Sequence, residues 1–148
     1  MPARLKFDDG IKEFEVNGKE LLRFNPSDPN VYRRFFEVAE ELPAVEEDFR
    51  KRAERLDKED AVALLGLMGE LDKKVKERLS YVFGPENDFE RILGGVNLMA
   101  VGQNGQRIVV NVLEAFQPIL EEGVKQHRKE AAAEAVAQAK ARRAAAGE

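Results

Sequence analysis

The chain contains 148 residues, of which 43% are hydrophobic and 35% are charged, a length typical of one domain with its own hydrophobic core. It has no cysteine and one histidine, which excludes disulfides, thiolate metal sites and cysteine catalysis. The net charge of −4 provides no positive field to attract a nucleic acid. No apolar run follows Met1 and no stretch approaches the roughly 18 apolar residues of a membrane span, so we expect a soluble, intracellular protein.

The first part of the chain, residues 4–24, has the pattern of two strands. Asn17-Gly18 lies between two apolar stretches, and this dipeptide is typical of a two-residue hairpin turn because both residues tolerate positive φ. A two-residue turn places Phe14 opposite Leu21 and leaves apolar side chains on both faces. Because an isolated hairpin is marginally stable in water, we expect it to pack on helices or to pair with another chain.

Two proline residues mark the limits of the next predicted helix. Pro29 suits the first helical position, and Ser27 or Asp28 can cap the helix. Pro43 disfavours helical geometry in the residue before it, so we predict a short helix that ends there. Residues 44–83, highly charged at first and then apolar, predict one long helix or two helices joined end to end.

The last third of the chain predicts a short helix, a loop and a long helix. Asp88 can cap the short helix, which two glycines end. Residues 97–99 can form a brief extended segment, and residues 102–105 are predicted to form a loop. The long helix follows, with a kink expected at Pro118, which has no amide proton to donate.

The C-terminal residues differ in composition from the rest of the chain. Residues 125–148 carry six basic and three acidic side chains, whereas residues 1–124 carry 18 and 25. This alanine-rich tail has almost nothing to bury, so we predict a solvated helix or a disordered segment. The whole chain is predicted to be mostly α-helical, with one helical domain carrying an N-terminal β-hairpin over residues 1–126 and a charged tail over residues 127–148.

No group of residues predicts catalysis or a metal site. His127 has only Glu130 on its helical face, too few ligands for a metal ion. The acidic residues at 46–48 and 57–60 are interleaved with Arg and Lys, which is typical of a solvated helix and not of carboxylates with separated pKa values. The glycine-rich segments match neither phosphate-binding pattern. We therefore expect no enzyme activity and no cofactor.

The apolar run from Ala61 to Leu71 is the strongest candidate for a binding surface. A helix that is apolar on every side is either central in its fold or presents a second face to a partner, and both interpretations stay open here. Gly66 and Gly69 each cost about 1 kcal/mol relative to alanine in a helix interior, which indicates close approach of another element. The candidate partner-binding residues, from this run and from the charged helix before it, are Leu64, Leu67, Met68, Leu71, Phe49 and Leu56.

Two stretches, residues 14–36 and residues 96–119, carry a family resemblance. The first joins the Asn-Gly hairpin to an Asn-Pro-Ser-Asp entry into an aromatic helix, and the second ends in Phe-Gln-Pro-Ile at 116–119. A charged long helix and a Phe-Gly break at 83–84 lie between them. This order of features resembles the tail assembly chaperones of long-tailed bacteriophages and of prophages in Gram-positive bacteria, over about residues 10–124.

The resemblance implies a non-enzymatic role in the host cytoplasm. Such chaperones coat the tape measure protein, a very long and aggregation-prone helical chain, help to recruit tail tube subunits and leave before the virion matures. Many phages also make a longer form by ribosomal frameshifting, and this chain would correspond to the short form. The open hairpin edge and the apolar run also permit a homo-oligomer. The competing interpretation is a structural phage protein, such as a head–tail connector or a tail completion protein, that stays in the virion.

Overall fold

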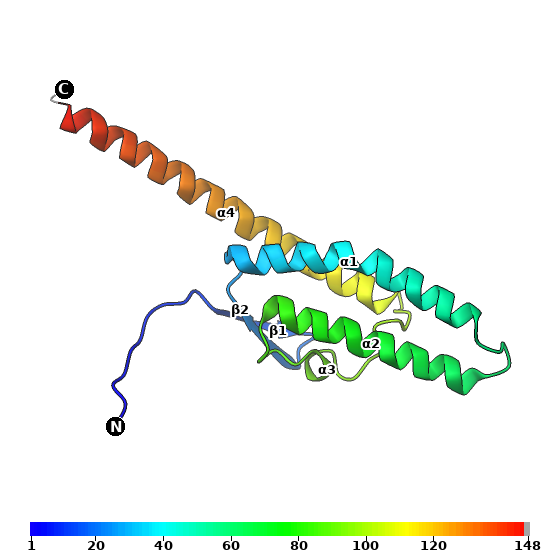
Figure 1. Ribbon diagram of the computed structural model, residues 1–148. Helices are drawn as coiled ribbons and strands as arrows, with labels where there is room; N and C mark the ends of the chain where they lie inside the picture. The colour runs from blue at the N-terminus through cyan, green and yellow to red at the C-terminus, as the bar shows by residue number, and fades with distance from the viewer. Residues whose placement is uncertain (147–148) are drawn as a thin grey trace.

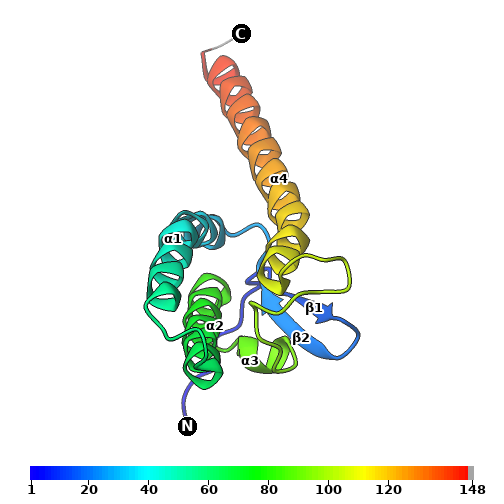
Figure 2. The same cartoon turned by 90° about the vertical axis from the view of Figure 1, so that its right-hand side faces the viewer.

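The computed structural model describes residues 1–146 as a mostly α-helical fold with an N-terminal hairpin, as predicted. α1 and α2 lie side by side as an antiparallel pair, the hairpin and α3 pack near α2, and α4 leaves this body as a long single helix (Figure 1). Seen from the end, α1 and α2 occupy one side and the hairpin the other (Figure 2). The elements in chain order are β1 (Lys12–Val16), β2 (Glu20–Phe24), α1 (Pro29–Glu54), α2 (Ala61–Phe83), α3 (Phe89–Ile92) and α4 (Ile108–Ala145).

The hairpin turn is one residue longer than predicted. Residues 17–19 connect the strands, and Phe14 pairs with Leu22 instead of Leu21. The first two turn residues have positive φ, 51° and 72°, as the Asn-Gly dipeptide predicts. Because a shift of one residue moves every side chain of a strand to the other face, Leu22 and Phe24 are now buried while Leu21 is exposed. The prediction that neither face would be cleanly buried is wrong for this reason.

Residues 1–11 form an exposed N-terminal arm without regular structure, so the predicted strand does not begin at residue 4. The arm extends away from the body (Figure 1). No neighbouring strand pairs with it among residues 1–146, and an unpaired segment has no ladder of backbone hydrogen bonds to hold it extended.

α1 begins where predicted but does not end at Pro43. The side chain of Asp28 accepts a hydrogen bond from the amide of Asn30 at 2.9 Å and caps the helix. The helix then continues through Pro43 to Glu54. Leu42 and Val45, on either side of the proline, are partly buried against the core, and this packing maintains helical geometry despite the missing donor.

The break between α1 and α2 lies at residues 55–60, which corrects the prediction of continuous or end-to-end helices over residues 44–83. Asp57 accepts a hydrogen bond from the amide of Glu59 at 3.1 Å, and Asp60 accepts one from the amide of Ala63 at 3.0 Å. Such side-chain acceptors compete with the helix and favour turns and N-caps. The chain therefore reverses direction here, and α2 packs back on α1.

The short helix, the loop and the long helix of the last third form as predicted, whereas one segment differs. Asp88 caps α3 through the amide of Glu90 at 3.0 Å, and two glycines with positive φ follow the helix. Residues 97–99 form a turn and not an extended segment, because the Asn97 side chain accepts a hydrogen bond from the amide of Met99 at 2.8 Å. Residues 102–105 form the predicted loop.

α4 runs as one helix from Ile108 to Ala145, through Pro118. The predicted boundary between the domain and the tail, at residues 126 and 127, lies within this continuous helix. The division of the chain into a domain and a separate tail stays a prediction. Its side chains are exposed from Lys125 onward. At about 1.5 Å per residue, roughly 30 Å of this helix is exposed to solvent among residues 1–146.

Four phenylalanines join the hairpin to three helices at the centre of the core. The ring of Phe83 lies 4.8 Å from that of Phe24, 5.8 Å from that of Phe89 and 4.4 Å from that of Phe116, measured between centroids. These distances fall within the favoured range for aromatic pairs. The cluster connects β2, α2, α3 and α4.

A glycine in α4 allows this helix to pack closely against the segment before α1. A Cβ added to Gly123 would lie 1.9 Å from the carbonyl oxygen of Pro26 and 2.2 Å from the hydroxyl of Tyr32. That hydroxyl donates a hydrogen bond to the same carbonyl at 2.6 Å. The helix can approach so closely only because residue 123 has no side chain.

Candidate functional site

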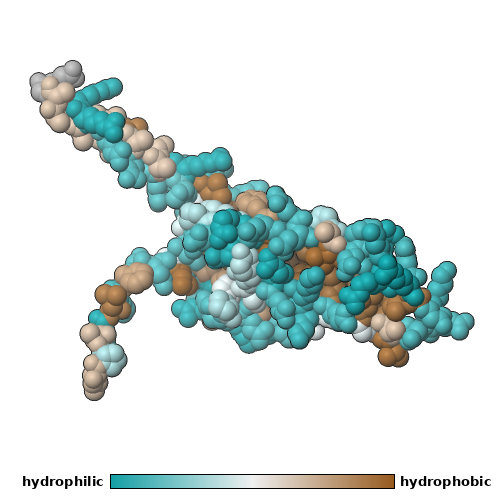
Figure 3. All heavy atoms as spheres, viewed as in Figure 1, coloured by the Kyte–Doolittle hydropathy of each residue, from teal (hydrophilic) through white to brown (hydrophobic). Residues whose placement is uncertain are grey.

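A groove of about 800 Å³ lies between the second half of α1 and the first half of α2. We call it the tip groove. Figure 3 shows hydrophobic side chains reaching the surface along this helical pair. The apolar residues that line the groove are Phe49, Ala53, Leu56, Ala61, Leu64 and Leu71.

The structure brings four of the six predicted partner-binding residues together in this groove: Phe49, Leu56, Leu64 and Leu71. Leu64 is 40% exposed. The other two lie elsewhere. Leu67 is only 7% exposed and lines a small cavity of about 150 Å³ between α1 and α2, and Met68 is partly buried against the core. The run therefore contributes buried residues to the interior of the fold, whereas binding of a partner by its exposed residues stays a prediction.

α2 also has an unpartnered face, formed by Val62, Leu65, Gly66 and Gly69, which we call the open face. Val62 and Leu65 are strongly exposed. A Cβ added to either glycine would meet no atom within 4 Å. The close approach that the two glycines predict is therefore absent within residues 1–146.

The rim of the tip groove carries more acidic than basic side chains. On the α1 side, Arg50 donates hydrogen bonds to Glu47 and Glu54, and its hydrogen bond holds the pKa of Glu47 below the usual value. Asp57 and Asp60 serve as turn and cap acceptors. The charged residues of the rim are Glu46, Glu47, Arg50, Glu54, Asp57, Lys58, Asp60 and Arg107.

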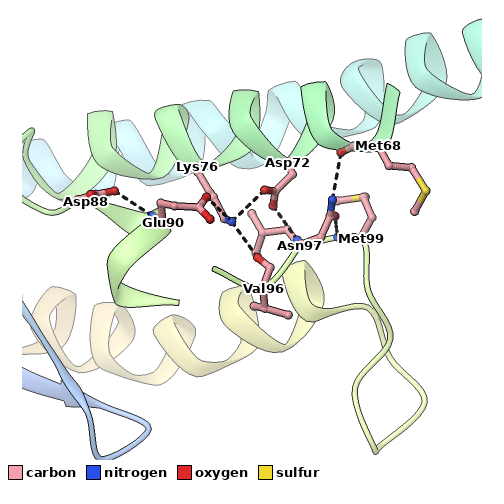
Figure 4. A network of polar contacts seen from close by, with 9 residues as sticks. Met68, Asp72, Lys76, Asp88, Glu90, Val96, Asn97 and Met99 are labelled. Carbon is pink, nitrogen blue, oxygen red and sulfur yellow. Dashed lines mark hydrogen bonds and ion pairs between the residues drawn. The ribbon is translucent and has the colours of Figure 1, made fainter. Parts of the chain in front are cut away.

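A second cluster of charges lies beneath α2 (Figure 4). The ammonium group of Lys76 donates hydrogen bonds to Asp72 at 2.9 Å, to Glu90 at 2.7 Å and to the carbonyl of Val96 at 2.8 Å. Asp72 also accepts a hydrogen bond from the amide of Leu98 at 2.8 Å. The cluster ties the segment that follows α3 to α2.

This cluster is structural because its donors are fully used. A lysine ammonium has three protons, and each has a partner in the chain. Burial by itself lowers the pKa of Lys76, but the hydrogen bonds and charges of Glu90 and Asp72 outweigh it, and the pKa is raised. The group therefore stays charged and has no proton free for a substrate. Sequence reasoning missed it, since a Lys four residues after an Asp on a helix is usually solvated.

Other chemistry finds little support among residues 1–146. His127 lies exposed on the outer part of α4, and no three His, Cys, Asp or Glu side chains of this range are grouped as metal ligands. Within the same range, no helix combines the length and the apolar character needed to cross a membrane. The chain matches no protein-family model, no curated protein and no solved structure. Function is therefore inferred from the tip groove and from the order of features along the sequence.

Proposed function

We propose that this protein is a tail assembly chaperone of a long-tailed bacteriophage or prophage, which binds the tape measure protein without catalysing a reaction. The observation that carries the proposal is the tip groove. Its residues Leu56 and Leu64 lie outside the main core cluster and remain partly accessible. Apolar side chains gathered in a groove at the free end of a helical pair are suited to receive a helix from another protein.

The groove favours an amphipathic helix with an apolar stripe and basic flanks. An apolar stripe laid on Phe49, Leu56 and Leu64 leaves water together with the groove lining, which removes the surface through which a long helical protein aggregates. The acidic excess of the rim attracts Lys and Arg beside that stripe. Because the lining is already partly buried, each contact is modest, and a bound helix can be released when tail assembly proceeds.

Co-expression with the tape measure protein of the same phage tests the proposal. The soluble fraction of the tape measure protein should rise in the presence of the wild-type chain and fall back with Leu64→Asp. Leu65→Asp is the matched control, because it places the same charge one residue away on the open face. Circular dichroism should show both variants folded. A tape measure protein equally soluble with and without the chain would refute the proposed function, and equal effects of the two variants would refute the site.

The same proposal includes recruitment of the tail tube protein, action in the host cytoplasm and absence from the mature virion. One observation favours the alternative of a structural head–tail connector or tail completion protein: the part of α4 from Lys125 to Ala145 is exposed along its whole length in the part of the chain that the structure describes. Mass spectrometry of purified virions distinguishes the two, since a connector is present in mature particles and a chaperone is absent.

A further inference from the structure

The two edges of the hairpin differ in accessibility. At the outer edge of β2, the Asn87 side chain accepts a hydrogen bond from the amide of Arg23 at 3.0 Å and donates one to its carbonyl at 2.8 Å. This side chain is buried and closes the edge as a neighbouring strand would. Among residues 1–146, β1 pairs only with β2, so its outer edge offers unpaired backbone groups to another strand.

An apolar groove of about 680 Å³ lies beside that open edge. It runs between the hairpin and α4, and its lining includes Phe14, Val16, Phe116 and Ile119. A strand added to β1 places every second side chain on the same face as Phe14 and Val16, toward this groove. The opposite face of β1 carries Glu13 and Glu15, both exposed.

The N-terminal arm has the matching pattern. Leu5 and Phe7 are 89% and 76% exposed, and they alternate with the basic residues Arg4 and Lys6. This alternation is that of a strand with one apolar face and one basic face. It complements β1, whose inner face carries Phe14 and Val16 next to the groove, with the exposed Lys12 at its beginning, and whose outer face is acidic.

We propose that two copies of this chain exchange their N-terminal arms, so that residues 4–7 of each copy extend the sheet of the other along β1. In the antiparallel register that overlaps the arm with β1, Leu5 lies opposite Phe14. Arg4 then lies opposite Glu15, and Lys6 lies opposite Glu13. Opposite charges at directly facing positions stabilise a strand pair, and the exchange is an isologous two-fold contact.

The arm is directed away from its own β1 edge. Asn25, the residue after β2, donates a hydrogen bond from its side chain to the carbonyl of Asp9 at 2.9 Å. The base of the arm is thus held on the β2 side, opposite the free edge of β1, and the arm projects from the body (Figure 1). The arm therefore does not pair with its own β1 in the structure, and pairing with a second copy leaves this hydrogen bond in place.

Complementary charge reversal tests the exchange independently of any phage partner. One variant carries Arg4→Glu and Lys6→Glu, so its arm and its β1 are both acidic. The other carries Glu13→Lys and Glu15→Lys, so both are basic. All four positions are exposed, and circular dichroism should show both variants folded.

Sedimentation equilibrium should show a dimer for the wild-type chain, monomers for each variant alone and a heterodimer when the two are mixed. A wild-type chain that stays monomeric overturns the exchange, as expected if the arm folds back on its own β1. Variants that dimerise as well as the wild-type chain also overturn it, because association then uses another surface. Neither result bears on binding of a tape measure protein, which the soluble-fraction assay measures separately.

Discussion

Gly123 provides a direct test of how α4 is attached to the body. Replacement by alanine adds a Cβ that would lie 1.9 Å from the Pro26 carbonyl oxygen and 2.2 Å from the Tyr32 hydroxyl. The first of these atoms belongs to the backbone and cannot rotate away. Gly66→Ala is the matched control, since the same methyl group there meets no atom within 4 Å.

The two substitutions should change stability in opposite directions. Alanine is favoured over glycine in a helix interior by about 1 kcal/mol, and at Gly66 nothing opposes this gain. At Gly123 overpacking costs about 1–3 kcal/mol. Displacement of Tyr32 or Pro26 also breaks their hydrogen bond, which contributes about 0.5–1.5 kcal/mol. The balance at Gly123 is a net loss of about 0.5–3.5 kcal/mol.

Urea denaturation of the two variants and the wild-type chain measures the difference. Each 1 kcal/mol also shifts the Tm by roughly 2–4 °C in a chain of about this size. Because both variants gain the same helix propensity, the gap between them isolates the steric contribution at Gly123. A Gly123→Ala chain as stable as the Gly66→Ala chain would show that α4 does not approach the Pro26 carbonyl as described.

Three further predictions concern buried charge, pH and the α1–α2 contact. Lys76→Met should lower the free energy of unfolding by about 3–5 kcal/mol, because it leaves the buried carboxylate of Asp72 without its partner. The control Lys73→Met, at an exposed position, should change this free energy little, and denaturant titration measures both variants. The pKa of Tyr32 is raised above its ordinary value of 10.0, and that of Lys76 above its ordinary value of 10.5. The folded state therefore retains protons that the unfolded chain releases, and the free energy of unfolding should fall as the pH rises above these ordinary values. An unfolding free energy that does not fall as the pH rises into the alkaline range would contradict this linkage. Leu67→Asp should destabilise the chain by more than about 2 kcal/mol because it buries a charge between α1 and α2, whereas Leu64→Asp should unfold near the wild-type temperature in a thermal melt followed by circular dichroism.

The elements that depend on contacts within a few residues could be predicted from the sequence. Asp28 and Asp88 cap their helices through amides two residues away. Asn17 and Gly18 adopt the positive φ that these two residue types tolerate. Each of these features is complete within one turn of chain. A local pattern is therefore sufficient evidence for it.

The end of α1 could not be predicted in the same way. A proline inside a helix costs about 3 kcal/mol, and this value alone predicts an end at Pro43. Full burial of an apolar side chain contributes about 1.5–3 kcal/mol, and the partly buried Leu42, Val45 and Phe49 each gain a share of this by packing on the core. Two or three such contacts outweigh the proline, but they exist only once α2 lies beside α1.

The candidate site also has features that the local sequence pattern predicts and features that depend on tertiary contacts. Periodicity predicted an apolar helix and a set of candidate partner-binding residues, because the helical repeat assigns side chains to faces before any folding. Which face is covered depends on α1, which buries Leu67 and leaves Leu64 in the tip groove. The one-residue change in the hairpin turn likewise decided which face of each strand is buried. As a result, the face of β1 that carries Glu13 and Glu15 is exposed to solvent. The sequence by itself determined the helical character and the caps, because these depend on chemistry between neighbouring residues. The tertiary structure decided the strand register, the length of α1 and the exposed face of α2, because these depend on surfaces that residues distant in sequence bury together.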